Sequence, residues 1–526
     1  MKIAVVGSGI AGLASTWALN EYSDHQVHLY EAEDRIGGHA NTVLLPARAG
    51  FEECHVDTAF IAFNRCTYPN FLQFLRLDPA IRILSTSMSF SVSRDNGFFE
   101  WSGNNMRSIF CQRKRLLDPS MWILLYDIIR FNMCARRLLD GPVELGLSIG
   151  EYLHREGYSD SFRDNYLLPM TAGIWSTPPD AFAMTFPAQT LIQFMMNHQL
   201  LRVIGKSEWL TIAGGSQEYI KRIIEALPRD QLHLSTPVQS LTNIGDAAAP
   251  QILLTTANGE SEAFDRVIFA CHSDAALSIL KAGGGLTDEE HQILGAFRWN
   301  ENECVLHYDE ELMPKNREAW SCWNYLAESS VDEYGETRLN PPRLSITCTY
   351  RVLSGELPTF YLPLEVGMNA LQHLSYAKHG PVLVTLNPPY EPRPEMIIGR
   401  WKYDHPLLDA NAKRSQALLK CIQGVRSIYY AGAYLKYGFH EDGFTTGLEA
   451  AEAVAASCSS SLRLPFSVVR DGGQSPKAVS PIWCRIAALA FDMLEMSGIR
   501  RVVGSLLGSV MAAVRWIFSF WADMKM

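Results

Sequence analysis

The chain has 526 residues, of which 47% are apolar and 19% charged. At about 150 residues per domain, this length allows roughly three or four domain-sized units. The composition is typical of a globular protein with a large core, and it excludes a disordered, collagen-like or fibrous chain. The net charge of −10 argues against nucleic acid as a partner, because binding a polyanion needs a basic surface.

The eleven cysteines are scattered singly, with no CxxC and no Cys/His spacing that suits zinc or an iron–sulfur cluster. An odd number of dispersed thiols is typical of a reducing compartment. The chain begins at once with a strand-like run, which argues against a cleaved secretory signal. We therefore expect no metal site and an intracellular location, in the cytosol or on the cytoplasmic face of a membrane.

Residues 1–45 are predicted to form a βαβ unit. The apolar run 3–6 predicts a strand that leads directly into the glycine-rich segment 7–12, of sequence GSGIAG. A helix over 13–22 and a second strand over 26–31 follow. The segment therefore stands between a strand and a helix, which is the context that a dinucleotide-binding GxGxxG motif requires.

Each glycine of this motif has a separate physical role. Gly7 permits the tight turn, Gly9 lets the main chain approach a pyrophosphate, and Gly12 lets the helix pack closely on the strand. Glu31, at the end of the second strand, is placed to accept a hydrogen bond from the nucleotide ribose, and its charge disfavours NADP. The predicted pyrophosphate-binding residues are Gly7, Ser8, Gly9, Ala11 and Gly12.

Later elements follow from the same kind of pattern. Helical spacing of apolar residues predicts a long helix over 120–140, and apolar runs predict strands over 231–241, 266–271 and 427–432. An Ala- and Glu-rich helix is predicted over 443–456.

The composition changes after residue 456. Residues 457–480 are rich in Ser, Pro and Gly and are predicted to form a linker. Residues 481–526 are predicted to form a helical tail, whose apolar stripe over 499–521 has helical spacing. Because Arg515 near its middle would cost roughly 2.5–3.5 kcal/mol on insertion, we favour a helix lying in the membrane interface. A membrane-spanning helix and a helix docked on protein remain alternatives.

Two further segments indicate which nucleotide is bound. Residues 31–39 (EAEDRIGGH) resemble the E-x-x-x-R-x-G-G extension of FAD-binding oxidoreductases, and residues 427–456 resemble their C-terminal flavin motif. With GxGxxG, these segments identify the chain as a member of the superfamily of flavin-containing amine oxidases, phytoene desaturases and protoporphyrinogen oxidase. The runs 57–64, 171–178 and 437–443 resemble a subgroup described only as FAD/NAD(P)-binding oxidoreductases.

The resemblance implies an α/β fold with a discontinuous Rossmann-like FAD-binding domain of the glutathione-reductase type, an inserted α+β substrate domain and a C-terminal amphipathic helical tail. The expected boundaries are 1–85, 206–275 and 396–456 for the FAD-binding domain, 86–205 (helical) and 276–395 for the substrate domain, 457–480 for the linker, and 481–526 for the membrane-associating tail.

The family pattern also implies the remaining cofactor contacts. Arg35, Gly37, Gly38 and His39 would line the path toward the flavin. Val238 would lie on the strand whose main chain meets the adenine. The residues nearest the isoalloxazine would be Gly432, Ala433, Phe444 and Thr445.

The chain departs from the family pattern at three places. The segment 396–408 contains no cysteine for a covalent flavin link, so noncovalent FAD is implied. Phe444 stands where amine oxidases have the tyrosine of an aromatic cage; it lacks the hydroxyl but could still form a wall. Ala59 stands where many relatives have glycine beside the flavin.

His440-Glu441-Asp442 precedes the predicted flavin helix and is the best candidate for acid–base catalysis. An imidazole titrates near neutrality, and the adjacent carboxylate of Glu441 could orient it. The alternative is a structural cluster in which Asp442 accepts main-chain N–H groups at the helix start.

Together these features predict an FAD-dependent oxidoreductase that removes a hydride from a hydrophobic acyl, isoprenoid or polyketide-like substrate, by desaturation, oxidation or double-bond isomerisation. Because no second dinucleotide motif is present, molecular oxygen or a quinone is the expected acceptor. The alternatives are a flavin amine oxidase and a non-catalytic lipid or prenyl-protein carrier on the same fold.

Overall fold

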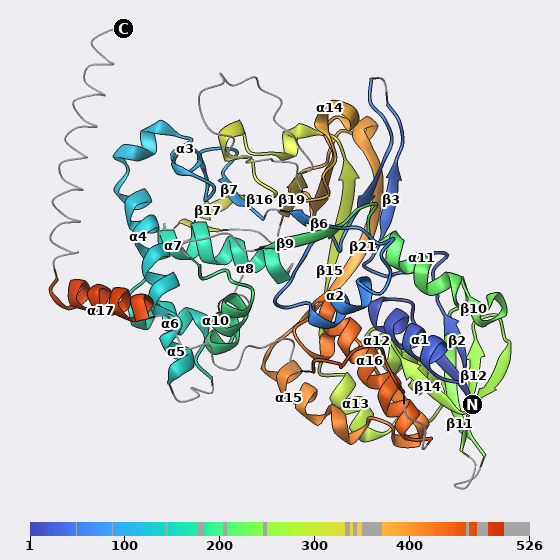
Figure 1. Ribbon diagram of the computed structural model, residues 1–526. Coiled ribbons are helices and arrows are strands. Elements are labelled where there is room, and N and C mark those ends of the chain that lie inside the picture. The colour runs from blue at the N-terminus through green and yellow to red at the C-terminus, as the bar shows by residue number, and fades with distance from the viewer. Residues whose placement is uncertain are drawn as a thin grey trace, which may run out of the picture.

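The computed structural model of the chain is shown in Figure 1. It describes residues 1–48, 50–86, 88–141, 146–175, 184, 186–202, 208–245, 250–331, 337–339, 345–349, 371–458, 462–470 and 482–498.

A five-stranded parallel sheet contains the predicted βαβ unit, with α1 (Ile10–Tyr22) between its first two strands. Residues 3–5 have no exposed surface, as expected for a strand covered on both faces. The prediction of a mixed α/β fold is confirmed. In spatial order the strands are β10 (Leu232–His233), β2 (Gln26–Tyr30), β1 (Lys2–Val6), β14 (Arg266–Phe269) and β22 (Ile428–Tyr430).

The strand order of this sheet reverses at β1. From β1 the chain crosses to β2 on one side, whereas β14 lies on the other side and arrives from a distant part of the sequence. In open parallel sheets, ligands bind where the strand order reverses, outside the carboxyl ends of the strands. The GxGxxG segment follows β1 directly at this edge.

Helix α16 (His440–Ala456) crosses α1 at very short range. A Cβ atom on Gly447 would lie 2.3 Å from the carbonyl oxygen of Ala11, and Ser15 Oγ donates a hydrogen bond of 2.9 Å to the Gly447 carbonyl. On the other side of α1, a Cβ atom on Gly12 would lie 1.9 Å from the carbonyl oxygen of Gly7. Glycine is therefore the only residue that permits these approaches.

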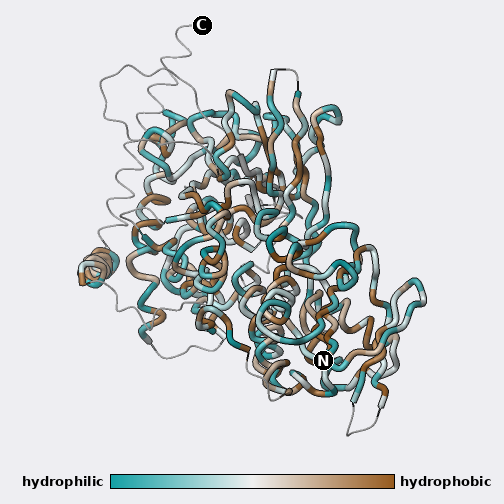
Figure 2. The backbone as a smooth tube through the Cα atoms, turned by 45° about the vertical axis from the view of Figure 1, so that its right-hand side comes forward, coloured by the Kyte–Doolittle hydropathy of each residue, from teal (hydrophilic) through white to brown (hydrophobic). Residues whose placement is uncertain are grey.

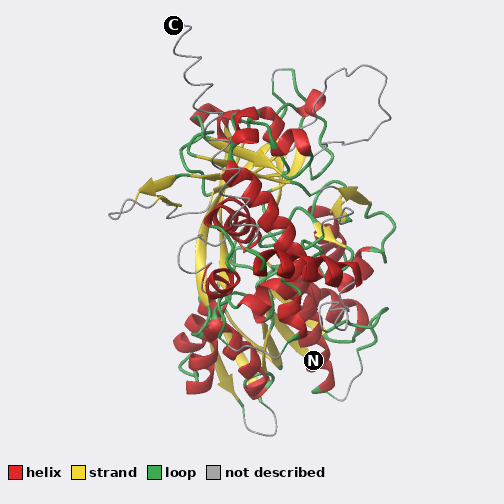
Figure 3. Cartoon of the chain, turned by 90° about the vertical axis from the view of Figure 1, so that its left-hand side faces the viewer, coloured by secondary structure: helices red, strands yellow, loops and turns green. Residues whose placement is uncertain are grey.

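A seven-stranded sheet and a group of helices form the second part of the molecule (Figures 1 and 3). One core joins them, since Val92 and Tyr325 from the strands are buried with Phe131 and Leu191 from the helices. The strands are β21 (Ile397–Leu407), β15 (Arg298–His307), β20 (Leu383–Leu386), β19 (Ser345–Thr349), β16 (Trp323–Ala327), β7 (Phe90–Arg94) and β8 (Phe99–Ser102). The helices include α3 (Met106–Ile109), α4 (Pro119–Cys134), α5 (Arg137–Asp140), α6 (Ile149–Glu156), α7 (Asp160–Phe162), α8 (Leu168–Trp175) and α10 (Ala188–Asn197).

Smaller elements complete the described fold. The remaining strands outside these two sheets include β3 (Thr42–Leu45) paired with β4 (Cys54–Asp57), β5 (Phe63–Asn64) and β6 (Ile83–Thr86) on either side of β9 (Trp209–Ile212), and β11 (Val238–Ile244), β12 (Gln251–Thr256) and β13 (Ser261–Phe264). Further helices are α2 (Pro69–Leu75), α11 (Gln217–Glu225), α12 (Ser273–Ala282), α13 (Asp288–Leu294), α14 (Tyr376–His379) and α15 (Ala410–Leu418).

Several predicted boundaries differ from the structure. The helix over 120–140 is two helices, α4 and α5, because Leu138 and Leu139 donate to carbonyls only three residues earlier. The strand over 231–241 is interrupted at Ser235, whose φ of 49° is left-handed. The expected boundary at residue 396 falls just before β21, which pairs with β15 and therefore belongs to the seven-stranded sheet.

The predicted linker is wrong for residues 462–470. Apolar side chains at alternating positions in this segment pack against the core around α1, and the ring of Phe466 stacks on Trp17 with centroids 6.0 Å apart. Val469 exchanges hydrogen bonds of 2.8 Å with the side chain of Asn70. The chain therefore remains attached to the core around α1 well beyond α16.

The first part of the predicted tail forms α17 (Ile482–Met496), which packs on α4. The rings of Phe491 and Tyr126 meet at 5.4 Å, and Asp492 pairs with Arg137 at 2.8 Å. The apolar stripe predicted over 499–521 lies outside the described residues. None of the described helices combines the length and apolarity needed to cross a membrane.

We predict that Gly447→Ala lowers the free energy of unfolding by about 1–3 kcal/mol, because the new methyl group would overlap the main chain of α1. Urea unfolding measures this. Gly103→Ala is the control, since the nearest atom to a Cβ there is 3.9 Å away. Equal stability of the two variants would show that α1 and α16 do not need their close contact.

Candidate active site

The glycine loop has the geometry of an anion-binding site. Gly7 has a φ of 103°, and a Cβ atom there would lie 2.9 Å from the Ala270 carbonyl oxygen. At Gly9, in contrast, a Cβ atom would enter open space. No side chain caps the N-terminus of α1, and its first turn contains no acidic residue. The free N–H groups and the positive end of the helix dipole therefore face a space that a phosphate can enter.

Glu31 lies beside this loop, as predicted for a ribose ligand. Its Oε2 accepts hydrogen bonds from the main-chain N–H and the hydroxyl of Ser8, at 2.9 and 2.5 Å, and its Oε1 accepts one from Glu33 N–H at 2.9 Å. The main-chain carbonyl of Glu31 accepts from Thr236 N–H at 2.8 Å, which brings the start of the strand with Val238 to the same place.

The predicted extension also reaches the glycine loop. Arg35 Nη1 donates to the Gly38 carbonyl at 2.7 Å, and Gly37 N–H donates to the Ser8 carbonyl at 3.1 Å. Gly38 has a φ of 56°, and a Cβ atom there would lie 3.2 Å from Gly9 Cα. The structure therefore brings together the two motifs that sequence analysis placed at one cofactor.

The N-terminus of α16 meets that of α1. A Cβ atom on Gly443, in the first turn of α16, would lie 2.6 Å from Ile10 Cγ2 and 3.6 Å from Ala433. Thr446 holds the preceding strand in place, because its hydroxyl donates to the Gly432 carbonyl at 3.1 Å and accepts from Gly432 N–H at 3.0 Å. Thr446 was not predicted, since a single threonine inside a helix gives no sequence signal.

Phe444 and Thr445 do not turn their side chains toward this junction, in contrast to the expectation of flavin contacts. Phe444 has no exposed surface and packs against Phe74 at 5.2 Å and Trp17 at 6.4 Å. The hydroxyl of Thr445 accepts a hydrogen bond of 2.8 Å from Asn70. Only the main chain of these two residues is left for a ligand at the start of α16.

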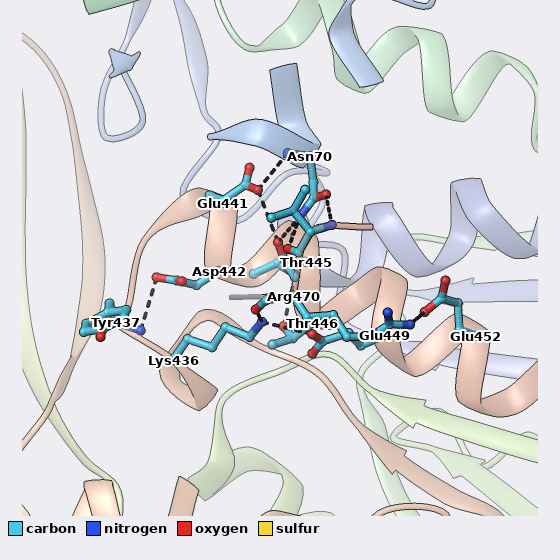
Figure 4. Close-up of polar contacts among 12 residues, drawn as sticks. Asn70, Lys436, Tyr437, Glu441, Asp442, Thr445, Thr446, Glu449, Glu452 and Arg470 are labelled. Atoms are coloured by element: carbon cyan, nitrogen blue, oxygen red, sulfur yellow. Dashed lines mark hydrogen bonds and ion pairs between the residues drawn. The ribbon is translucent and has the colours of Figure 1, made fainter. Parts of the chain in front are cut away.

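Glu441 caps a different helix (Figure 4). Its two carboxylate oxygens each accept a hydrogen bond of 2.9 Å, from the main-chain N–H groups of Asn70 and Phe71 in the first turn of α2. Burial raises the pKa of Glu441 to about 8. The carboxylate is therefore held by α2 and does not orient His440, as the predicted acid–base pair would require.

The alternative interpretation of this cluster is confirmed at Asp442. Its Oδ2 accepts hydrogen bonds from Phe439 N–H at 2.9 Å and from Tyr437 N–H at 3.2 Å (Figure 4 shows the second). These bonds fix the turn that leads into α16. Burial raises the pKa of Asp442 to about 6.

His440 lies in an aromatic box. Its ring stacks on Phe60 at 3.6 Å and meets the edge of Phe71 at 5.0 Å, and its Nε2 is 3.0 Å from the hydroxyl of Tyr219. Burial lowers the pKa of His440 to about 3, so the imidazole is neutral at pH 7. The expectation that it titrates near neutrality is wrong, because the aromatic surroundings exclude water from the charged form.

A polar group on the seven-stranded sheet adjoins His39. The rings of Tyr403 and His405, both on β21, lie 5.1 Å from that of His39. The hydroxyl of Tyr403 is 2.6 Å from that of Thr58, and Asn302 Nδ2 lies 2.9 Å from His405 Nδ1. No local sequence pattern marks Asn302 or His405, because they meet only through the pairing of β15 with β21.

Burial lowers the pKa of His39 well below its usual value, and the neighbouring His405 and His272 add to this shift. His39 is thus neutral, in agreement with a role in hydrogen bonding. The described residues contain no group of three or more potential metal ligands that could hold an ion.

A model of the family "Flavin containing amine oxidoreductase" matches residues 10–337, more than half of the chain. The chain belongs to this family. No curated protein sequence matches it. Solved structures with a similar fold include cyclohexylamine oxidase from Brevibacterium oxydans IH-35A (15% identity, 87% of this chain and 99% of that chain, TM-score 0.53). A fatty acid isomerase of P. acnes that produces CLA is similar (13%, 85% and 97%, TM-score 0.54), as is a reduced UDP-galactopyranose mutase (17%, 91% and 99%, TM-score 0.52).

This flavin-containing oxidoreductase is an enzyme with FAD as its cofactor. The residues present fit FAD, since Gly9 leaves a cradle that a Cβ atom would fill, α1 offers uncapped N–H groups, and Glu31 stands at its rim. When bound, FAD supplies a hydride acceptor.

We predict that Gly9→Leu folds normally but purifies without flavin, because the side chain would occupy the open space at the helix N-terminus. Flavin absorbance per polypeptide measures occupancy, and circular dichroism measures folding. Gly9→Ala, with a smaller side chain, is expected to retain more flavin than Gly9→Leu. Normal flavin occupancy in Gly9→Leu would refute the site.

Proposed function

We propose that this flavin-dependent oxidoreductase removes a hydride from a hydrophobic acyl, isoprenoid or polyketide-like substrate, with desaturation or double-bond isomerisation as the favoured outcome. The observation that carries the proposal is an aromatic wall at the start of α16. Phe439, the residue before the helix, packs against Phe194 at 5.0 Å and against Trp175 at 6.1 Å. These two partners come from α10 and α8 of the substrate side.

The polar groups around the wall also favour a neutral substrate. Burial lowers the pKa of His198 and His405 to about 4 and that of His440 to about 3, so these imidazoles carry no charge at pH 7. The carboxylates of Glu441 and Asp442 are occupied by main-chain N–H groups. The described rings near the start of α16 thus offer aromatic surface and uncharged imidazoles.

In this proposal, the chain's own residues bind the cofactor and position the substrate. The glycine loop and Glu31 hold a noncovalent FAD, the extension with Arg35 and Gly38 keeps the loop closed, and Phe439 with its partners excludes water from the reacting carbon. His440 acts as a neutral support for Phe60. In desaturation, molecular oxygen or a quinone accepts the two electrons, whereas isomerisation returns the hydride to the substrate and needs no external acceptor. Residues 481–526 contact the cytoplasmic face of a membrane, from which an apolar substrate can be drawn.

Amine oxidation is the second candidate, because the family model carries that description and one structural neighbour is a cyclohexylamine oxidase. Another neighbour is a fatty acid isomerase, so the fold accommodates both chemistries. A non-catalytic carrier is disfavoured by the open cradle at Gly9 beside Glu31.

We predict that, under anaerobic conditions, a panel of unsaturated fatty acids and prenyl alcohols reduces the bound flavin or yields a shifted double bond, whereas putrescine and cyclohexylamine do neither. Flavin absorbance and product analysis read out the two reactions. Phe439→Ala should raise KM for the apolar substrate more than it lowers kcat, because it removes binding surface. Tyr390→Ala, at an exposed position, is the control. Flavin reduction by the amines alone would contradict the proposal.

A further inference from the structure

Helix α17 presents its two acidic residues to the protein and most of its large apolar residues to solvent. Asp492 pairs with Arg137 at 2.8 Å, and Glu495 accepts a hydrogen bond of 2.8 Å from the hydroxyl of Tyr126 and lies 3.7 Å from Arg130. Cys484 and Ala488 are the only fully buried residues of the helix. The exposed large apolar side chains are Ile482, Trp483, Ile486, Leu489, Met493, Leu494 and Met496, with exposed fractions of 38–87%.

This orientation is the reverse of that of an ordinary surface helix, whose apolar stripe faces the core. Ile482, Ile486, Leu489 and Met493 follow each other at spacings of three and four residues, so they form one continuous stripe. Arg485 is the only ionisable residue among the exposed residues of α17. In water such a stripe is unfavourable, because roughly 25 cal/mol is lost for each Å² of apolar surface left uncovered.

The stripe continues onto the body of the protein. Trp122, Tyr126 and Ile129 share one face of α4, and α17 packs on Tyr126 in the middle of that face. Trp122 and Ile129, on either side of it, are 46% and 45% exposed. In Figure 1, α17 lies beside α4 at the edge of the molecule farthest from the FAD-side sheet, and in Figure 2 its coil lies at the periphery of the molecule.

Positive charge gathers at the same face although the whole chain carries a net charge of −10. Residues 104–139 contain seven Lys and Arg but only two Asp. Arg113, Arg115, Arg130 and Arg137 are paired with carboxylates, whereas no ion pair among the described residues involves Arg107 or Lys114. Lys114 lies over the ring of Phe98, which is 61% exposed, at 5.3 Å. Arg107 is exposed beside the exposed Met106 in α3, and Phe110, just after α3, packs on Trp122 at 5.1 Å.

From these observations we propose that α17 and the adjoining face of α3 and α4 form a lipid-binding surface that lies on an anionic membrane. The inference rests on the proposed membrane contact of residues 481–526 and extends it to the body of the protein. Aliphatic side chains, exposed tryptophans and cations with apolar stems form the combination that binds at a lipid interface. In a symmetric dimer formed through this surface, the Lys and Arg side chains of the two copies would face each other. Their repulsion argues against a second copy of the chain as the binding partner.

The test uses the full-length holoprotein and sedimentation with vesicles of phosphatidylcholine alone or mixed with phosphatidylglycerol. We expect binding to the mixed vesicles to exceed binding to phosphatidylcholine vesicles. Arg107→Glu with Lys114→Glu should lower binding to the mixed vesicles by about 30-fold or more, since each cation near an anionic surface contributes about 1 kcal/mol. Ile486→Asp with Leu489→Asp should lower binding to both kinds of vesicle.

Leu77→Asp with Leu418→Asp is the matched control, because these side chains are 45% and 42% exposed on the FAD side of the molecule. This control should bind vesicles like the wild type. Every variant retains residues 499–526. Each variant is expected to bind flavin and to react with substrate anaerobically like the wild type, so membrane binding and the proposed chemistry are tested independently. Unchanged vesicle binding in both test variants would overturn the proposal and leave the membrane contact to other residues. A wild-type dimer that Ile486→Asp with Leu489→Asp converts to monomers would also overturn it.

Discussion

The close crossing of α1 and α16 is the constraint on which the rest of the structure depends. Gly447 permits it from α16, and Gly12 permits α1 to lie on the turn after β1. As a result, the positive ends of two helices that begin at residues 10 and 440 meet at one edge of the parallel sheet. One end faces the space beside Gly9, and the other adjoins Ala433. An extended anionic cofactor can bridge both.

The buried carboxylates of α16 stabilise this junction from outside the cofactor site. Glu441 caps α2, Asp442 fixes the turn before α16, and Asn70 connects α2 to the segment 462–470. These bonds explain why two acidic residues in a row stand in the first turn of a buried helix. They supply structure, so the chemistry has to come from the cofactor and from the side chains that shape the substrate space.

The glycine loop, the position of Glu31 and the βαβ unit were predictable, because each depends on a short sequence pattern with a local physical cause. The roles of Glu441 and Thr446 were not, since their partners lie on other segments and no local pattern names them. The same is true of His405 and Asn302, which meet only through pairing of β15 with β21. Residues 462–470 were predicted to be part of a linker because Ser, Arg and Pro separate the apolar residues of this segment. In the structure those apolar side chains pack against the core around α1.

We propose that one FAD bridges the two helix ends. Amide hydrogen exchange of the apoprotein and its FAD complex tests it most directly, because first-turn N–H groups without partners exchange fast until a ligand binds them. The account predicts that FAD slows exchange together in residues 8–13, 31–39 and 433–444. Protection confined to the glycine loop, with no change at the start of α16, would contradict it.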